Sequence, residues 1–101
     1  MLIRVREDQS LTLEEEDNFK GFCIRVKDLD TNISSLDVIT NRIEGSNYWL
    51  DTQGVIALSS KSTDKEWLNQ FWGMLESAEP YGFADLEAQL IRAHIQYDIA
   101  N

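Results

Sequence analysis

The stretch STDKEWLNQFWGMLESA, residues 62–78, decides the fold class because it separates two kinds of sequence pattern. Its large apolar residues are Trp67, Leu68, Phe71, Trp72 and Leu75. They recur every three or four positions, which is the spacing of one face of an α-helix. Thr63 and Glu66 stand three residues apart, as in a capping box, and mark the start of this helix. Before residue 62 apolar and polar residues alternate, so the sequence predicts strands first and helices afterwards.

The first 60 residues contain short alternating segments that are typical of half-buried strands. Strands are expected at residues 2–6, 19–27, 38–43, 48–50 and 55–59. Residues 9–17 are ambiguous, although the alternation at residues 11–13 favours a short strand. The strands at residues 48–50 and 55–59 are joined by residues 51–54, in which Asp51 and Gly54 favour a hairpin turn. A second turn is expected at residues 44–47, around Gly45. We therefore expect an antiparallel sheet of four to five strands in residues 1–60.

Residues 83–99 predict a second helix, after a break at Pro80 and Gly82. On a helical wheel its apolar residues form two stripes that together cover roughly 240°, more than one packing face needs. The second stripe is therefore predicted to form a homodimer contact, through Ala84, Ala88, Ile91 and Ile95. The alternative is that the first helix covers both stripes. The expected architecture is a single α+β domain, residues 1–101, with both C-terminal helices packed on one face of the sheet.

Composition limits the classes of function. The chain has 101 residues, with 18 acidic against nine basic residues and a net charge of −9. This charge repels nucleic acids and anionic membranes and favours a basic protein partner. The single cysteine excludes an internal disulfide, and no segment has the pattern of a signal peptide or a membrane span. A cytoplasmic location is expected.

No motif supports catalysis, a cofactor or a metal site, so none of these is predicted. Cys23 and His94 are the only thiol and the only imidazole, and a catalytic pair would need them within hydrogen-bonding reach. On the expected second helix Glu87, His94 and Asp98 form a narrow polar wedge. One imidazole and two carboxylates can hold a metal ion, but a local ion pair between His94 and Asp98 is the favoured interpretation.

Basic residues are concentrated near the N-terminus. Four of them are expected on one face of the sheet: Arg4, Arg6, Arg25 and Lys27. Such a patch suits an anionic ligand, but its favoured role is to face the acidic run at residues 14–17.

Four aromatic residues are candidate contacts for a partner or ligand: Trp49, Trp67, Trp72 and Tyr81. Trp67 and Trp72 are about 140° apart on the helix, so one of them is expected at the edge of a groove. The favoured function is a small acidic, non-catalytic interaction protein that binds a basic protein partner. It is comparable, in size and charge alone, with small inhibitors and immunity proteins of toxic nucleases. The alternatives are a homodimer that binds a small molecule in an aromatic pocket between sheet and helices, and an enzyme of unrecognised type.

Overall fold

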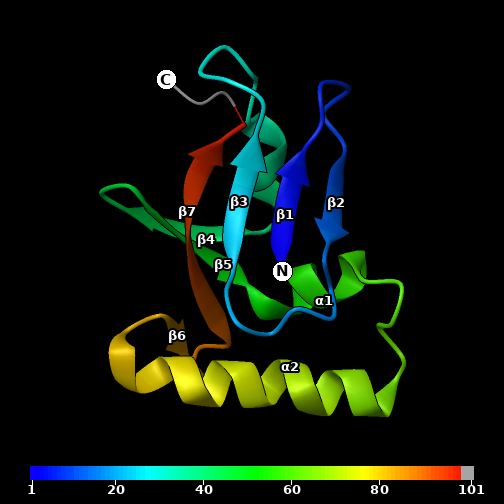
Figure 1. Ribbon diagram of the computed structural model, residues 1–101. Helices are drawn as coiled ribbons and strands as arrows, with labels where there is room; N and C mark the ends of the chain where they lie inside the picture. The colour runs from blue at the N-terminus through cyan, green and yellow to red at the C-terminus, as the bar shows by residue number, and fades with distance from the viewer. Residues whose placement is uncertain (99–101) are drawn as a thin grey trace.

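A computed structural model describes residues 1–98 and shows a mixed β-sheet with helices behind one face and across one end (Figure 1). The strands are β1 (Leu2–Val5), β2 (Leu11–Glu14), β3 (Cys23–Val26), β4 (Thr40–Glu44), β5 (Asn47–Asp51), β6 (Ala84–Asp85) and β7 (Leu90–Tyr97). The helices are α1 (Thr52–Leu58) and α2 (Lys65–Ala78), and two 3₁₀ turns are η1 (Ser34–Val38) and η2 (Glu79–Tyr81). The α+β class is confirmed, with seven strands in place of the expected four to five.

The sheet has the strand order β2-β1-β3-β7-β5-β4, and the short β6 pairs with β7. β3 pairs in parallel with both β1 and β7, whereas the other pairings are antiparallel. β7 comes from the end of the described chain but lies in the middle of the sheet, where it joins β3 to β5 (Figure 1). The expected sheet, confined to residues 1–60, therefore lacks its central strand.

The predicted second helix, residues 83–99, is wrong: the segment forms β6, a turn and β7, and its last residue lies outside the described part of the chain. From residue 91 the sequence alternates strictly. Ile91, Ala93 and Ile95 face the core, while Arg92, His94 and Gln96 face the other side of the sheet. Alternate residues of a strand lie on one face, but a helical wheel places them far apart around the axis. This explains why the apolar residues of the segment formed two stripes on the wheel. An apolar arc as wide as roughly 240° is unusual for a helix, and it indicated that apolar residues recur every two positions, as in a strand.

The predicted strand at residues 55–59 is also wrong, because α1 occupies most of it. Asp51 does not begin a hairpin turn; its side chain accepts a hydrogen bond from the backbone N–H of Gln53 and caps α1. Gly54 is needed for close packing, since a Cβ there would lie 2.7 Å from Cγ2 of Ile39. The hairpin in this region instead joins β4 and β5 through Gly45, which has a φ of 60°.

The predicted first helix is confirmed as α2, although Asp64 rather than Thr63 caps it, by accepting from the N–H groups of Glu66 and Trp67. α2 runs across the end of the sheet where β1 and β3 begin, while α1 and η1 lie behind the sheet (Figure 1). Trp67, Phe71 and Leu75 form its buried row. They join one apolar core with residues of the sheet, η1 and α1, such as Ile3, Ile24, Leu36, Leu50, Val55 and Ile91.

Within the described residues, no helix combines the length and the apolar character required to cross a membrane.

Candidate functional site

The outer face of the sheet, opposite the core, carries basic residues that are already paired with acidic ones. Arg4 and Arg25 are neighbours in the register of β1 and β3. Asp98 lies between them and forms ion pairs with both, at 2.9 Å and 3.2 Å. Arg4 also pairs with Glu14 at 2.8 Å, so one of the four basic residues contacts the acidic run as expected. Because these charges neutralise one another, this patch offers little free charge to a ligand.

The other two predicted members of the basic face lie beyond the ends of the strands, where both are exposed. Lys27 pairs with Glu7 at 2.8 Å. Arg6 joins Arg4 and Lys27 in lining a shallow cleft that also contains Glu7 and Asp98. Three of the four cations therefore line one cleft, and Asp98 connects Arg25 to it, but Arg4, Arg25 and Lys27 are already paired with acidic residues.

The predicted polar wedge does not form, because the helix that would have carried it is absent. Glu87 lies in the turn between β6 and β7, His94 lies within β7, and Asp98 follows β7. His94 lies 3.2 Å from the side-chain amide of Gln96, while Asp98 is engaged by the two arginines. The predicted ion pair between His94 and Asp98 is not formed.

Cys23 and His94 come closer together than their sequence positions suggest. They directly precede Ile24 and Ile95, which are paired between β3 and β7, and both line a shallow cleft of about 500 Å³. Among the described residues, however, no hydrogen bond joins the thiol to the imidazole. The arrangement therefore lacks the contact by which an imidazole activates a thiol.

The three tryptophans named as candidate contacts have structural roles. Trp67 is 2% exposed, stacks on Phe71 at 5.2 Å and donates from Nε1 to the carbonyl of Glu16 at 2.7 Å. Trp72 is half-buried, with its ring edge-on to Phe71 at 5.7 Å. Trp49 is 9% exposed and lies beneath the guanidinium of Arg42. Tyr81 is the one candidate of the four that remains open to solvent, at 77% exposure.

Tyr81 belongs to a surface that we call the acidic corner. It comprises the end of α2 and the turns that follow, with the side chains Glu76, Glu79, Tyr81, Phe83, Asp85 and Glu87. Residues 76–91 hold four acidic residues and no basic residue. None of these four carboxylates forms an ion pair within residues 1–98. The acidic corner therefore carries four carboxylates without an ion-pair partner in the described chain.

Local turn chemistry shapes the acidic corner. Pro80 ends the α-helix in η2, and Gly82 has a φ of 83°, a left-handed conformation that reverses the chain. The carboxylate of Glu79 accepts from the N–H of Leu86 at 2.8 Å, and that of Asp85 accepts from the N–H of Ala88 at 3.0 Å. These backbone contacts hold two acidic side chains in place without neutralising them.

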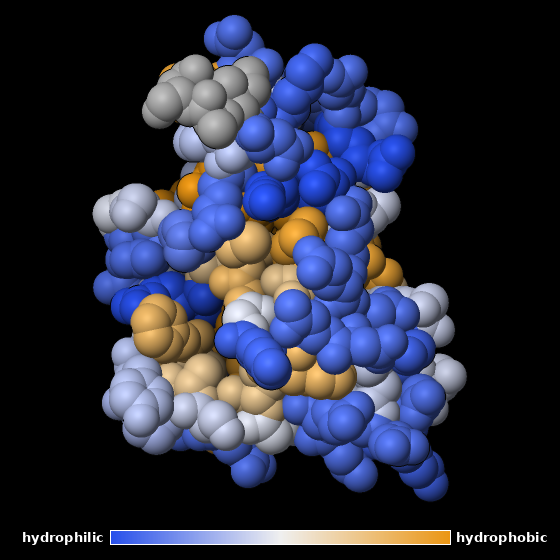
Figure 2. All heavy atoms as spheres, viewed as in Figure 1, coloured by the Kyte–Doolittle hydropathy of each residue, from blue (hydrophilic) through white to orange (hydrophobic). Residues whose placement is uncertain are grey.

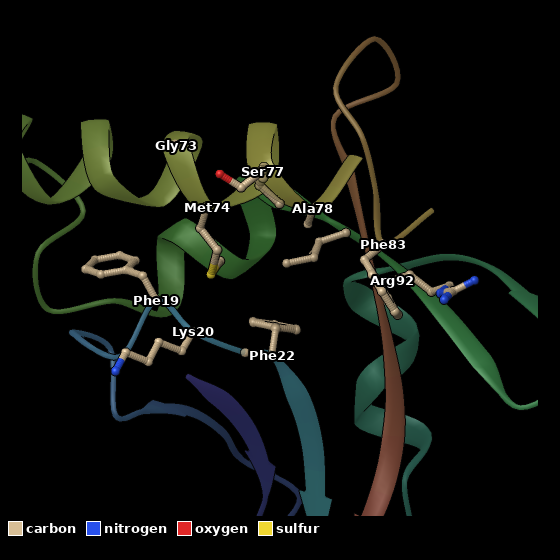
Figure 3. Close-up of a pocket in the computed structure, with 12 residues that line it drawn as sticks. Phe19, Lys20, Phe22, Gly73, Met74, Ser77, Ala78, Phe83 and Arg92 are labelled. Atoms are coloured by element: carbon tan, nitrogen blue, oxygen red, sulfur yellow. The ribbon is translucent and has the colours of Figure 1, made fainter. Parts of the chain in front are cut away.

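A groove lies beside the acidic corner, between α2 and the loop at residues 19–22 (Figure 3). Its volume is about 620 Å³. Most of its lining is apolar, and its charged side chains are those of Lys20 and Arg92. The residues that line it are Phe19, Lys20, Gly21, Phe22, Gly73, Met74, Leu75, Ser77, Ala78, Phe83, Ile91 and Arg92.

The loop that forms one wall of the groove is fastened by contacts that we call the Glu16 clasp. The carboxylate of Glu16 accepts from the hydroxyl groups of Ser59 and Ser60, which precede α2. These hydrogen bonds, above all that from Ser60, hold the pKa of Glu16 below its ordinary value. Lys61 pairs with Asp17 at 2.8 Å. The clasp therefore fixes the loop relative to α2, together with the hydrogen bond from Trp67 to the Glu16 carbonyl.

The residues predicted for a dimer contact do not form a stripe. Ala84 and Ile91 are paired between β6 and β7 and are buried, at 5% and 3% exposure. Ala88 is exposed in the turn, and Ile95 is half-buried beside Ile24 in the sheet. Self-association stays a prediction, but it has lost the helical surface on which it was based.

Sequence reasoning missed the groove and the exposed ring of Phe83. The groove joins segments that are about 50 residues apart in the chain, so no local pattern could reveal it. The exposure of Phe83 had a signal, because it directly follows the breaking sequence Pro80–Gly82. Comparison with protein-family models, curated proteins and solved structures finds no match to this chain.

Proposed function

We propose that the protein is a small, non-catalytic interaction protein that binds a basic protein partner through the acidic corner. The observation that carries the proposal is the combination of exposed aromatic rings and carboxylates without ion-pair partners in the described chain. The partner would supply lysine or arginine side chains to the carboxylates and an apolar surface to the rings.

The exposed rings supply the contact area for such a complex. Tyr81 is 77% exposed and Phe83 is 48% exposed, although large aromatic side chains are normally buried. Aromatic residues, tyrosine above all, dominate the binding energy of many protein interfaces because they bury a large area and lose little conformational entropy. The rings lie at the end of a helix that is packed into the core by Phe71 and Leu75, so they are presented on a rigid support.

The carboxylates of the acidic corner would attract a basic partner and disfavour an acidic one. Since they have no ion-pair partners among residues 1–98, binding a basic partner breaks no internal ion pair. Opposite charge on two surfaces accelerates their encounter and makes it sensitive to salt. The basic residues on the outer face of the sheet, in contrast, already have acidic partners. The acidic corner is thus the better candidate for an electrostatically guided interface.

Site-specific photo-crosslinking tests the proposal. A photoreactive phenylalanine analogue placed at position 81 should capture a basic protein in the native host. The matched control is position 29, because Leu29 is 82% exposed and lies in the loop after β3, away from the acidic corner. Capture that is equal at the two positions, or confined to position 29, would exclude the acidic corner as the interface.

The captured partner should then be purified and its affinity measured with variants. Tyr81→Ala should weaken binding about tenfold or more, as expected for an aromatic anchor. The double variant Glu76→Gln, Glu87→Gln should slow association, and this effect should shrink at high salt. The control Leu29→Ala should bind like the unmodified protein. A partner whose affinity is the same at low and high salt would contradict the electrostatic part of the proposal.

A further inference from the structure

The groove beside α2 has a charge opposite to that of the whole protein. In the chain acidic residues outnumber basic ones by 18 to nine, yet the lining of the groove contains two cations and no acidic residue. Figure 2 shows apolar atoms exposed in a band above α2, with hydrophilic residues around them. An apolar surface with a few positive charges is complementary to a molecule that has an apolar body and a negative group.

We propose that the groove binds a small amphipathic carboxylate, whose apolar body lies between α2 and the loop and whose carboxylate pairs with Arg92. The apolar body would lie against Phe22, Met74 and Ile91, which line the groove. In Figure 3, Met74 points from α2 into the space above Phe22. The volume of about 620 Å³ falls within the usual range for small-molecule sites, roughly 300–1,000 Å³.

Arg92 has the geometry expected of a carboxylate anchor. Its guanidinium stacks on the ring of Phe83, with 4.5 Å between Cζ and the ring centroid. Stacking occupies the face of the guanidinium and leaves its N–H groups at the edge, where a carboxylate binds with two parallel hydrogen bonds. Within residues 1–98 the Arg92 side chain donates no hydrogen bond and forms no ion pair. Arg4, Arg25 and Arg42, in contrast, each pair with an acidic residue.

Lys20 adds a second positive charge to the groove. It lies on the loop wall, and Figure 3 shows it on the opposite side of the apolar space from Arg92. It is exposed, and it too has no ion-pair partner in the described chain. Two unpaired cations would disfavour a cationic or basic ligand, and they supply no favourable interaction to a neutral one. The charge therefore selects an anionic ligand, while the apolar lining selects one with a hydrocarbon or aromatic body.

Calorimetric titration with dodecanoate, below its micelle-forming concentration, tests the proposal. Dodecanol and dodecyltrimethylammonium are matched probes with the same chain and a neutral or positive head. Dodecanoate should bind with one molecule per chain and at least about tenfold more tightly than either, because only it can accept charge-assisted hydrogen bonds from Arg92. Equal affinity for dodecanoate and dodecanol, or no binding of dodecanoate, would overturn the proposal.

Two variants test where the ligand lies. Arg92→Gln should weaken dodecanoate binding about tenfold and leave dodecanol binding unchanged. Its control is Arg42→Gln, since Arg42 also stacks on an aromatic ring of the sheet, that of Trp49, but does not line the groove. Loss of affinity that is equal in the two variants would mean that only the net charge of the protein matters, and it would overturn the site.

A third variant narrows the entrance of the groove. Gly73 lies in its wall, and a Cβ there would meet nothing within 4 Å. Gly73→Leu also improves helix propensity, so the protein should fold while losing dodecanoate. Tyr81→Ala should leave dodecanoate binding unchanged, which separates this site from the proposed protein interface. If Gly73→Leu instead converts a dimer into a monomer in sedimentation, a second copy of the chain occupies the groove and the carboxylate site is excluded.

Discussion

Two regions of the molecule use acidic residues in opposite ways. On the outer face of the sheet Glu14 and Asp98 each contact arginine at 2.8–3.2 Å, and the charges of β1 and β3 neutralise one another. In the acidic corner the carboxylates accept hydrogen bonds from the backbone or face solvent, and in the described residues none has a basic partner. The difference teaches that net charge alone does not locate a binding surface. What matters is which charges the fold leaves without partners.

The largest expected effect comes from detaching the acidic corner from the sheet. Phe71 is fully buried and connects α2 to the core. Phe71→Ala should lower the free energy of unfolding by about 3–5 kcal/mol, because it removes apolar contacts and leaves a cavity. Urea unfolding measures this loss. Asn69→Ala, on the exposed side of the same helix, is the control and should change stability by less than about 0.5 kcal/mol. A similar small loss for Phe71→Ala would show that α2 is not packed as described.

A smaller effect distinguishes paired from unpaired carboxylates. Asp98→Asn removes the charge that separates Arg4 from Arg25 and should lower stability by about 1 kcal/mol, since both pairs are partly exposed. Glu87→Gln, in the acidic corner, should leave stability unchanged or raise it slightly, because it relieves repulsion between like charges. Urea unfolding of both variants in low salt and in high salt gives the comparison. The loss in Asp98→Asn should shrink at high salt. If both variants lost the same amount of stability, the paired carboxylate of the sheet and the unpaired one of the acidic corner would not differ as described.

The smallest expected effect concerns the Glu16 clasp, which lies before the start of α2, whereas the acidic corner lies at its end. Hydrogen bonds from Ser60 and Ser59 lower the pKa of Glu16 in the folded state below the ordinary value of 4.5. Between the folded pKa and 4.5 the unfolded chain therefore binds more protons, and stability rises with pH across that window. The stabilisation is fully present above about pH 4.5 and is lost as the pH falls through the folded pKa.

An NMR titration of the Glu16 side chain measures this pKa directly. Glu16→Gln should remove its share of the pH dependence of unfolding between acid and neutral pH. Ser60→Ala should move the pKa of Glu16 back toward 4.5, because it deletes the main hydrogen bond to the carboxylate. An unshifted pKa in the unmodified protein would show that the clasp does not form in solution.

The sequence by itself determined the parts of the fold in which one local pattern dominates. The strand at residues 2–5 has clear alternation, α2 has a long helical period and a cap, and Gly45 marks the hairpin turn. From the predicted apolar face of α2, Trp67, Phe71 and Leu75 are buried, whereas Leu68 and Trp72 are half-buried. For the site, the sequence named Tyr81 as one of four aromatic candidate contacts, and it is the one of the four that is open to solvent, at 77% exposure.

Only the tertiary structure decided the segments in which two patterns compete. The short apolar run at residues 55–59 suits a strand or a helix; the cap from Asp51 and the close contact of Gly54 with Ile39 select the helix. Residues 91–97 alternate as a strand does, but within residues 83–99 their apolar residues also fit a wide helical arc; pairing with both β3 and β5 forms the strand. The burial of the tryptophans and the shape of the groove depend on contacts between distant segments, such as Trp67 with Glu16. Such contacts leave no local period in a sequence, because they are determined by packing in three dimensions.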